Sequence, residues 1–251
     1  MGLAHRIIPV LLMRNFNLVK GKRFDSSRVV GNIHQAAEIH QARGVDEMLV
    51  LDVGATISGS GPNYAIVRDL TEKCFMPITV GGGIQHTDHI RGLLNSGADK
   101  VLLGTAAYED PSVITRAANK FGSQAISVAI DVLYADGIWC MSTRCGTVSH
   151  CYSPVAFARE MEDRGAGELI VTAVRNDGMM AGYDLGLIRK IAKEVSIPVV
   201  ANGGCGTYEH MHRALKAGAS AVAAGSMFQW TDQTPREAAE YLRDKGWEVR
   251  L

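Results

Sequence analysis

An internal repeat constrains the fold of this chain more than any other feature. Residues 77–83 (PITVGGG) and 198–204 (PVVANGG) share a Pro, a β-branched residue and a Gly-Gly pair, 121 residues apart. The same offset relates GADKV at 97–101 to GASAV at 218–222, and GT at 104–105 to GS at 225–226. A repeat that stays in step over such a length indicates two copies of one structural unit.

Within each copy, short apolar segments alternate with amphipathic segments of helical period. The apolar segments have strand length and occur at 7–11, 48–52, 78–80, 101–104, 125–131, 169–172, 199–201 and 221–224. The amphipathic segments occur at 33–43, 64–74, 87–96, 111–120, 154–164, 187–195, 208–217 and 235–245. Near-continuous apolar strands are typical of a parallel sheet covered on both faces. The pattern predicts a single (β/α)8 TIM barrel over residues 1–251, built of two half-barrels at about 1–122 and 123–251.

Composition excludes several other classes of protein. The 26 Lys+Arg balance the 26 Asp+Glu, so a basic surface for nucleic acid or for an anionic membrane is not expected. No apolar run approaches the roughly 20 residues of a membrane span, and the N-terminal segment is too short for a signal peptide. The five Cys form no C-x-x-C pair, which favours free thiols and a cytoplasmic protein.

Two long connections follow strands 1 and 5, at residues 13–25 and 132–152. The second carries Gly137 and Gly146 and is expected to form a small hairpin. Loops at the C-terminal ends of barrel strands surround the active site, so both connections are expected to act as lids.

Four of the strand ends carry glycine, in two adjacent pairs related by the repeat. Glycine lets backbone N–H groups approach an anion closely. The ends of strands 3–4 and of strands 7–8 are therefore two candidate phosphate sites, which predicts a ligand with a phosphate at each end. The alternative is that these glycines only form tight turns.

Between the two candidate sites, strand 5 ends in Asp131, a suitable general acid or base. The corresponding residue after strand 1 is Leu12, which cannot transfer a proton. This asymmetry distinguishes the two halves at the position where chemistry is expected.

Motifs spread along the chain resemble the cyclase subunit of imidazole glycerol phosphate synthase. They are RIIP at 6–9, LVKG at 18–21, VGGGI at 80–84, GSQ at 122–124, AID at 129–131, DG at 177–178, GYD at 182–184 and AAGS at 223–226. In that family the barrel receives ammonia from a separate glutaminase and reacts it with a bisphosphate ribonucleotide at the top face. The resemblance implies an acid/base pair of aspartates after strands 1 and 5. Asp131 matches the second, and Leu12 occupies the position of the first.

The resemblance also implies roles for residues at both ends of the barrel. Residues that match substrate- or phosphate-binding positions are Lys20, Asp52, Gly82, Gly83, Thr105, Asp177, Gly178, Gly203, Gly204, Gly225 and Ser226. At the opposite end, Arg6, Glu47, Lys100 and Glu168 match a ring of charges that gates the ammonia passage. The alternative is that these four form ion pairs that only stabilise the bottom face. Alternation along a strand lets Arg6 and Leu12 share a face but separates Glu47 from Asp52.

Three functions are compatible with these residues. A paralogue of this cyclase subunit with leucine after strand 1 resembles proteins of surface-polysaccharide loci, and it would pass ammonia to an amidotransferase that makes acetamidino sugars. A genuine histidine-pathway cyclase, which yields imidazole glycerol phosphate and aminoimidazole carboxamide ribotide, would need a substitute for the missing aspartate. A related phosphosugar isomerase would need one too.

The expected partners follow from the resemblance. A class I amidotransferase glutaminase is expected at the bottom face, and a phosphorylated small molecule at the top face. An ammonia-accepting sugar amidotransferase is expected only for the paralogue. No cofactor is expected, and no metal, because the His pairs at 86/89 and 210/212 lack a third ligand at suitable spacing.

Overall fold

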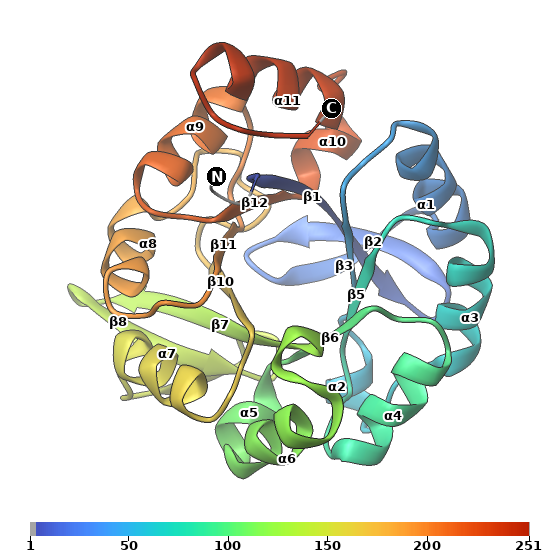
Figure 1. The fold of residues 1–251 in the computed structure, drawn as a ribbon, viewed down its shortest axis with the longest axis vertical. Coiled ribbons are helices and arrows are strands. Elements are labelled where there is room, and N and C mark those ends of the chain that lie inside the picture. Colours follow the sequence, from blue (N-terminus) through green and yellow to red (C-terminus); the bar gives the residue numbers. More distant parts are fainter. Residues whose placement is uncertain (1–3, 251) are drawn as a thin grey trace.

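The computed structural model describes residues 4–250 and forms a closed barrel of eight parallel strands surrounded by helices (Figure 1). The barrel strands are β1 (Arg6–Arg14), β4 (Met48–Asp52), β5 (Ile78–Gly81), β6 (Lys100–Leu103), β7 (Ile126–Ala135), β10 (Glu168–Ala173), β11 (Val199–Asn202) and β12 (Ala221–Ala224). Each strand pairs with the next in chain order. The pairs β1–β12 and β7–β10 complete the closed path. The predicted (β/α)8 TIM barrel is confirmed, and the boundary between half-barrels near residue 122 stays a prediction.

Eight longer helices cover the outside of the barrel, one after each strand (Figure 1). They are α1 (Ile33–Ala42), α3 (Tyr64–Lys73), α4 (Thr87–Asn95), α6 (Ser112–Phe121), α7 (Pro154–Asp163), α8 (Leu185–Ala192), α9 (Tyr208–Lys216) and α11 (Pro235–Asp244). Several begin at a side-chain cap, as when Thr234 and Glu237 form a capping box at α11. Each predicted amphipathic segment is therefore a helix, within two or three residues at its ends.

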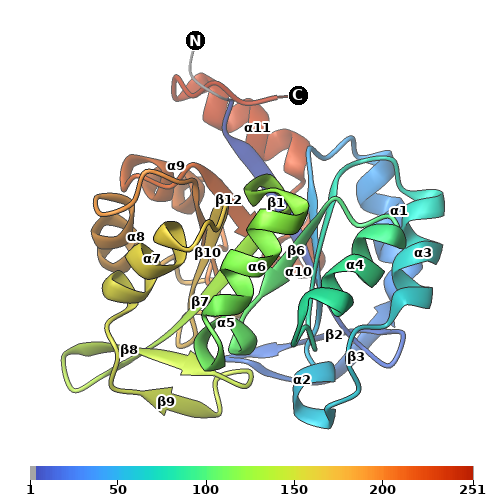
Figure 2. The same ribbon diagram turned by 60° about the horizontal axis from the view of Figure 1, so that its bottom comes forward.

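Two hairpins and several short helices lie at the C-terminal ends of the strands, and the chain termini lie at the other end (Figure 2). The hairpin strands are β2 (Asn17–Lys22) with β3 (Asp25–Asn32), and β8 (Ile138–Thr143) with β9 (Val148–His150). The short helices at this end are α2 (Ala55–Ser58), α5 (Thr105–Glu109) and α10 (Ser226–Trp230). A 3-10 turn, η1 (Ser123–Ala125), lies just before β7. The hairpin expected within 132–152 is confirmed.

The connection at 13–25, expected as a loop, is instead part of a second hairpin. β1 continues to Arg14 and pairs antiparallel with β2. Left-handed backbone at Asn15 and Phe16 makes the turn. Four basic residues between positions 14 and 23 interrupt the apolar alternation, so the sequence of this segment carries no clear strand pattern.

The strands separate two apolar cores. The larger lies between the sheet and the helices. The smaller fills the barrel and comprises Ile8, Val10, Leu49, Leu102, Ile170, Val200, Ala221 and Ala223, with Leu12, Leu51 and Ala129 packed against it. All five cysteines are free, as predicted. The described part of the chain contains no helix long and apolar enough to cross a bilayer.

Candidate functional site

A cavity of about 360 Å³ opens at the C-terminal ends of the barrel strands. It is lined by every residue that the sequence placed at this end: Leu12, Lys20, Asp52, Gly82, Gly83, Thr105, Asp131, Asp177, Gly178, Gly203, Gly204, Gly225 and Ser226. Both glycine-bearing pairs of strand ends therefore face one cavity. Because these residues lie up to 214 positions apart in the chain, only closure of the barrel brings them together.

The hairpin β2–β3 delivers a buried cation to this cavity. Lys20 is only 3% exposed, and its Nζ donates to the carbonyl of Val10 at 3.2 Å. A Cβ on Gly225 would lie 2.3 Å from this Nζ, so a side chain after β12 would displace the ammonium group from its present position. Burial lowers the pKa of Lys20 to about 8, although the nearby Asp177 opposes the shift. The cation thus lies beside one of the two glycine pairs.

The same hairpin is packed against the loop that follows β10. Arg23 N–H donates to the carbonyl of Asp177 at 2.8 Å. A Cβ on Gly178, which has φ +70°, would lie 2.1 Å from the carbonyl oxygen of Gly21. Burial raises the pKa of Asp177, and Lys20 and two backbone N–H groups counteract the rise. The hairpin therefore forms part of the cavity wall, which Lys20, Gly21 and Phe24 line.

Asp131 is the ionisable side chain at the end of β7. Burial raises its pKa to about 7, even though Thr172 lowers it by donating a hydrogen bond. Thr172 in turn accepts from Asn202 Nδ2 at 3.1 Å. A carboxyl group that titrates near neutrality can both accept and release a proton, which suits general acid–base chemistry.

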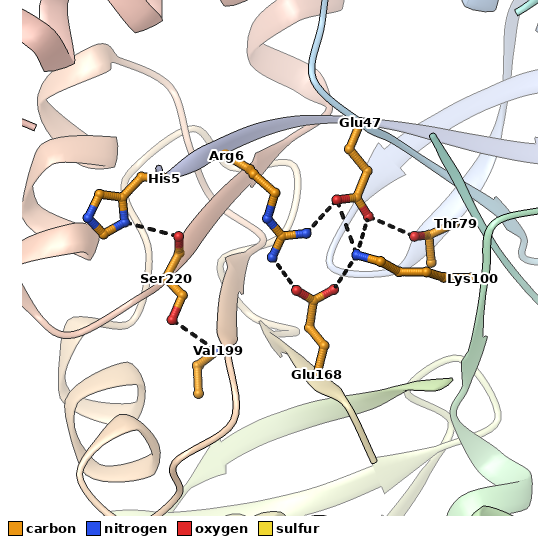
Figure 3. Close-up of polar contacts among 8 residues, drawn as sticks. All are labelled: His5, Arg6, Glu47, Thr79, Lys100, Glu168, Val199 and Ser220. Carbon is orange, nitrogen blue, oxygen red and sulfur yellow. Dashed lines mark hydrogen bonds and ion pairs between the residues drawn. The ribbon is translucent and has the colours of Figure 1, made fainter. Parts of the chain in front are cut away.

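Four charged side chains form a closed ring at the N-terminal end of the barrel (Figure 3). Arg6 contacts the carboxylates of both Glu47 and Glu168. Lys100 Nζ lies 3.1 Å from Glu47 and 3.5 Å from Glu168, and Thr79 Oγ1 donates to Glu47 at 2.8 Å. Burial alone would raise the pKa of Glu47, but the two cations together lower it. Both carboxylates are about 5% exposed, and each is paired with both cations, so the two negative charges are balanced within the ring.

A model of the histidine biosynthesis protein family matches residues 6–234. The imidazole glycerol phosphate synthase subunit HisF of Chlorobium phaeobacteroides is 41% identical over 99% of this chain and 100% of that protein. The subunit HisF of Chlorobaculum parvum is 40% identical with the same coverage. The chain belongs to this family.

This HisF-like chain has an apolar floor where one of the two aspartates was expected. Arg6, Ile8, Val10 and Leu12 alternate on the inner face of β1, so Leu12 lines the cavity on the same face as Arg6, as predicted. On β4 the inner face carries Leu49 and Leu51. Within the described residues, Asp131 is thus the acid/base side chain at the end of its strand, and the position after strand 1 stays apolar.

The carboxylate of Asp52 in this HisF-like chain accepts hydrogen bonds from the backbone of the residues that follow it. Its Oδ1 accepts from the N–H groups of Gly54 at 2.9 Å and Ala55 at 3.1 Å, at the start of α2. Burial raises its pKa and these hydrogen bonds oppose the rise. The predicted separation of Asp52 from Glu47 agrees with this geometry, because Asp52 follows the inward-facing Leu51.

The turn between β8 and β9 contributes residues that the sequence did not assign to the site. Arg144 N–H donates to Thr105 Oγ1 at 2.9 Å, and its guanidinium lies 3.0 Å from Glu109. Cys145 Sγ donates to the carbonyl of Val53 at 3.4 Å, and burial raises its pKa to about 11, which keeps the thiol protonated. The long connection after strand 5 indicated in the sequence that some of its residues reach the cavity. Which side chains do so depends on the strand register of the hairpin, which the sequence does not give.

The described residues of this family member contain no group of three His, Cys, Asp or Glu side chains arranged to hold a metal ion. The rings of His86 and His89 lie against each other in a tilted arrangement, with centroids 3.8 Å apart and planes at 39°. The cavity groups that could bind a ligand are backbone N–H groups, Lys20 and the carboxyl groups.

Proposed function

We propose that this chain is the barrel subunit of a glutamine-dependent enzyme, in which ammonia made by a separate class I glutaminase enters at the Arg6/Glu47/Lys100/Glu168 ring and reaches the cavity at the opposite end. The closed ring carries the proposal. Its two cations each bridge two buried carboxylates at the end of the barrel opposite the cavity. The curated relatives, named as synthase subunits, support a partner protein.

The cavity is proposed to bind a ligand that carries two phosphate groups. Glycine-lined backbone flanks it on both sides, and Lys20 supplies a cation beside Gly225. The main-chain N–H groups of these strand ends suit phosphate oxygens. The hairpin β2–β3, which carries Lys20, is proposed to close over the ligand.

Leu12 distinguishes two candidate functions, a barrel that only conducts ammonia and a barrel that is itself a cyclase. One positioned general acid or base contributes typically about 10²–10⁴ in rate, and a leucine side chain supplies none of it. We therefore favour a paralogue whose ammonia serves amidination of a surface-polysaccharide sugar by a further amidotransferase, with the barrel acting as conduit and docking platform. This form predicts that the barrel itself has little cyclase activity.

One observation favours the second candidate, the histidine-pathway cyclase. The residues singled out as matching substrate- or phosphate-binding positions all line the cavity, and burial raises the pKa of Asp131 to about 7. In that case a water molecule or Asp52 would have to act in place of the missing aspartate.

A cyclase assay with ammonium salt separates the candidates without a partner protein. The purified chain is compared with Leu12→Asp and with the matched control Leu12→Asn, which has the same shape without the ionisable group. The conduit form predicts no turnover of the bisphosphate formimino ribonucleotide by the unmodified chain and by Leu12→Asn, and clear turnover by Leu12→Asp. Turnover by the unmodified chain that Asp131→Asn abolishes would instead establish the cyclase.

A further inference from the structure

An unpaired hydroxyl lies inside the barrel, outside both the ring and the cavity. Ser127 on β7 is fully buried (0% exposed), and its Oγ has no hydrogen-bond partner among the described residues. Its neighbours two and four positions on, Ala129 and Asp131, line the cavity, so alternation along β7 directs Ser127 into the barrel as well. Leaving a buried hydroxyl without a partner costs free energy, so a polar guest at this point would be favoured.

Its height in the barrel places Ser127 between the ring and the cavity. In the strand register Ser127 pairs with Glu168 of the ring on one side and with Leu102 on the other. Ala129, one layer above it, belongs to the cavity floor. Ser127 is therefore just inside the ring on the way to the cavity.

The surroundings of Ser127 are apolar. The barrel interior is filled by aliphatic side chains, among them Ile8, Leu49 and Ile170. An apolar interior penalises an ammonium ion far more than neutral ammonia. The ring carboxylates next to it are already paired with Arg6 and Lys100, so they offer no further counter-charge to a cation.

We infer that Ser127 is a binding station for neutral ammonia on its way from the ring to the cavity. The Ser127 hydroxyl can donate to the lone pair of ammonia and its oxygen can accept an N–H, so one small guest satisfies the group in either orientation. This inference rests on the proposed function, because it presupposes that ammonia enters the barrel.

Crystals of the full chain soaked in ammonium chloride and in sodium chloride, at the same alkaline pH, test the station directly. The expected result is a density peak within hydrogen-bond distance of Ser127 Oγ in ammonium that is absent or much weaker in sodium. Peaks of equal height in both salts would identify a structural water, and no peak in either would leave the hydroxyl empty; both results overturn the inference.

Two variants connect the station to transport. In the complex with the glutaminase, Ser127→Ala is expected to lower the share of glutamine-derived nitrogen in the product about three- to tenfold against added ¹⁵N-ammonium, the factor that one hydrogen bond supplies. Ser142→Ala is the control, because Ser142 is also a buried serine without a hydrogen-bond partner among the described residues. It pairs with Asp131 across β7 and β8, beside the cavity and not between the ring and the cavity, so the variant can change turnover but is expected to leave the share of glutamine-derived nitrogen unchanged. Equal effects of both variants would overturn the inference that Ser127 binds ammonia, and would leave the proposed function standing. Failure of the unmodified chain to bind a glutaminase would instead overturn the proposed function.

Discussion

At the scale of single residues, Asp131 shows how position in the barrel sets chemistry. The sequence places an aspartate at the end of a strand, and nothing in its neighbours along the chain predicts an unusual pKa. Burial in the cavity wall raises this pKa to about 7, against a hydrogen bond from Thr172. The carboxyl group therefore titrates in the range where an acid/base residue is useful.

The raised pKa predicts a pH-dependent stability. Between about pH 4 and pH 7 the folded protein binds more protons at Asp131 than the unfolded chain does. The contribution of this group to the free energy of unfolding is therefore full at low pH and is lost as the pH rises through about 7. Asp131→Asn removes the titration. The free energy of unfolding of the variant minus that of the unmodified chain is expected to be about 2 kcal/mol larger at neutral pH than at acid pH. This value is smaller than the full pKa shift would give, because Asp131 lines an open cavity.

Urea unfolding of both proteins at about pH 5 and about pH 8 measures this difference. Other titrating groups are common to the two chains and cancel in the comparison. A difference in unfolding free energy that is the same at both pH values would contradict a buried, raised carboxyl group at Asp131.

At the scale of elements, the hairpin β2–β3 joins the cavity to the loop after β10. Its contacts are a hydrogen bond from Arg23 to Asp177 and the close approach of Gly178 to Gly21. These contacts involve backbone atoms, so they depend on the absence of a side chain at Gly178. The hairpin carries Lys20, and its docking therefore decides whether the cation faces the cavity.

Gly178→Ala is expected to displace the hairpin, because the added Cβ would lie 2.1 Å from the Gly21 carbonyl oxygen. The matched control is Gly137→Ala in the β7–β8 turn, where φ is +80° but no atom lies within 4 Å of the added Cβ. Both variants carry the strain of positive φ, on the order of 1 kcal/mol, and only the first also clashes.

Limited trypsin digestion detects the displacement, since Lys22 and Arg23 lie at the hairpin turn. Cleavage there is expected to accelerate in Gly178→Ala and to stay unchanged in Gly137→Ala. Equal cleavage rates in both variants would contradict the idea that the contact between Gly178 and Gly21 holds the hairpin in place.

At the scale of the whole molecule, the charged ring ties together four strands that are distant in sequence. Arg6 comes from β1, Lys100 from β6 and Glu168 from β10, and Glu47 immediately precedes β4. Removal of one partner from a buried ion pair leaves an uncompensated charge, which is strongly destabilising. The ring therefore contributes to stability as well as to the proposed passage of ammonia.

Arg6→Met is expected to destabilise the protein by about 3 kcal/mol, because two nearly buried carboxylates then share Lys100 alone. Arg236→Met is the control: it removes the same charge, but from an exposed pair with Glu240, and is expected to change stability by less than about 0.5 kcal/mol. Thermal or urea unfolding measures both. A similar loss in the two variants would show that the ring adds nothing beyond an ordinary surface pair.

The sequence alone determined the eight barrel strands, the longer helices and the residues at the strand ends, because these follow from local periodicity and from the alternation of side chains along a strand. It also identified Leu12, Asp131 and the four ring residues as candidate functional positions. The hairpin β2–β3, the contacts of Arg144 and the raised pKa of Asp131 were decided by the tertiary structure. The reason is physical: burial, strand stagger and close backbone approach depend on groups that are remote in the chain, and they exist only once the barrel has closed.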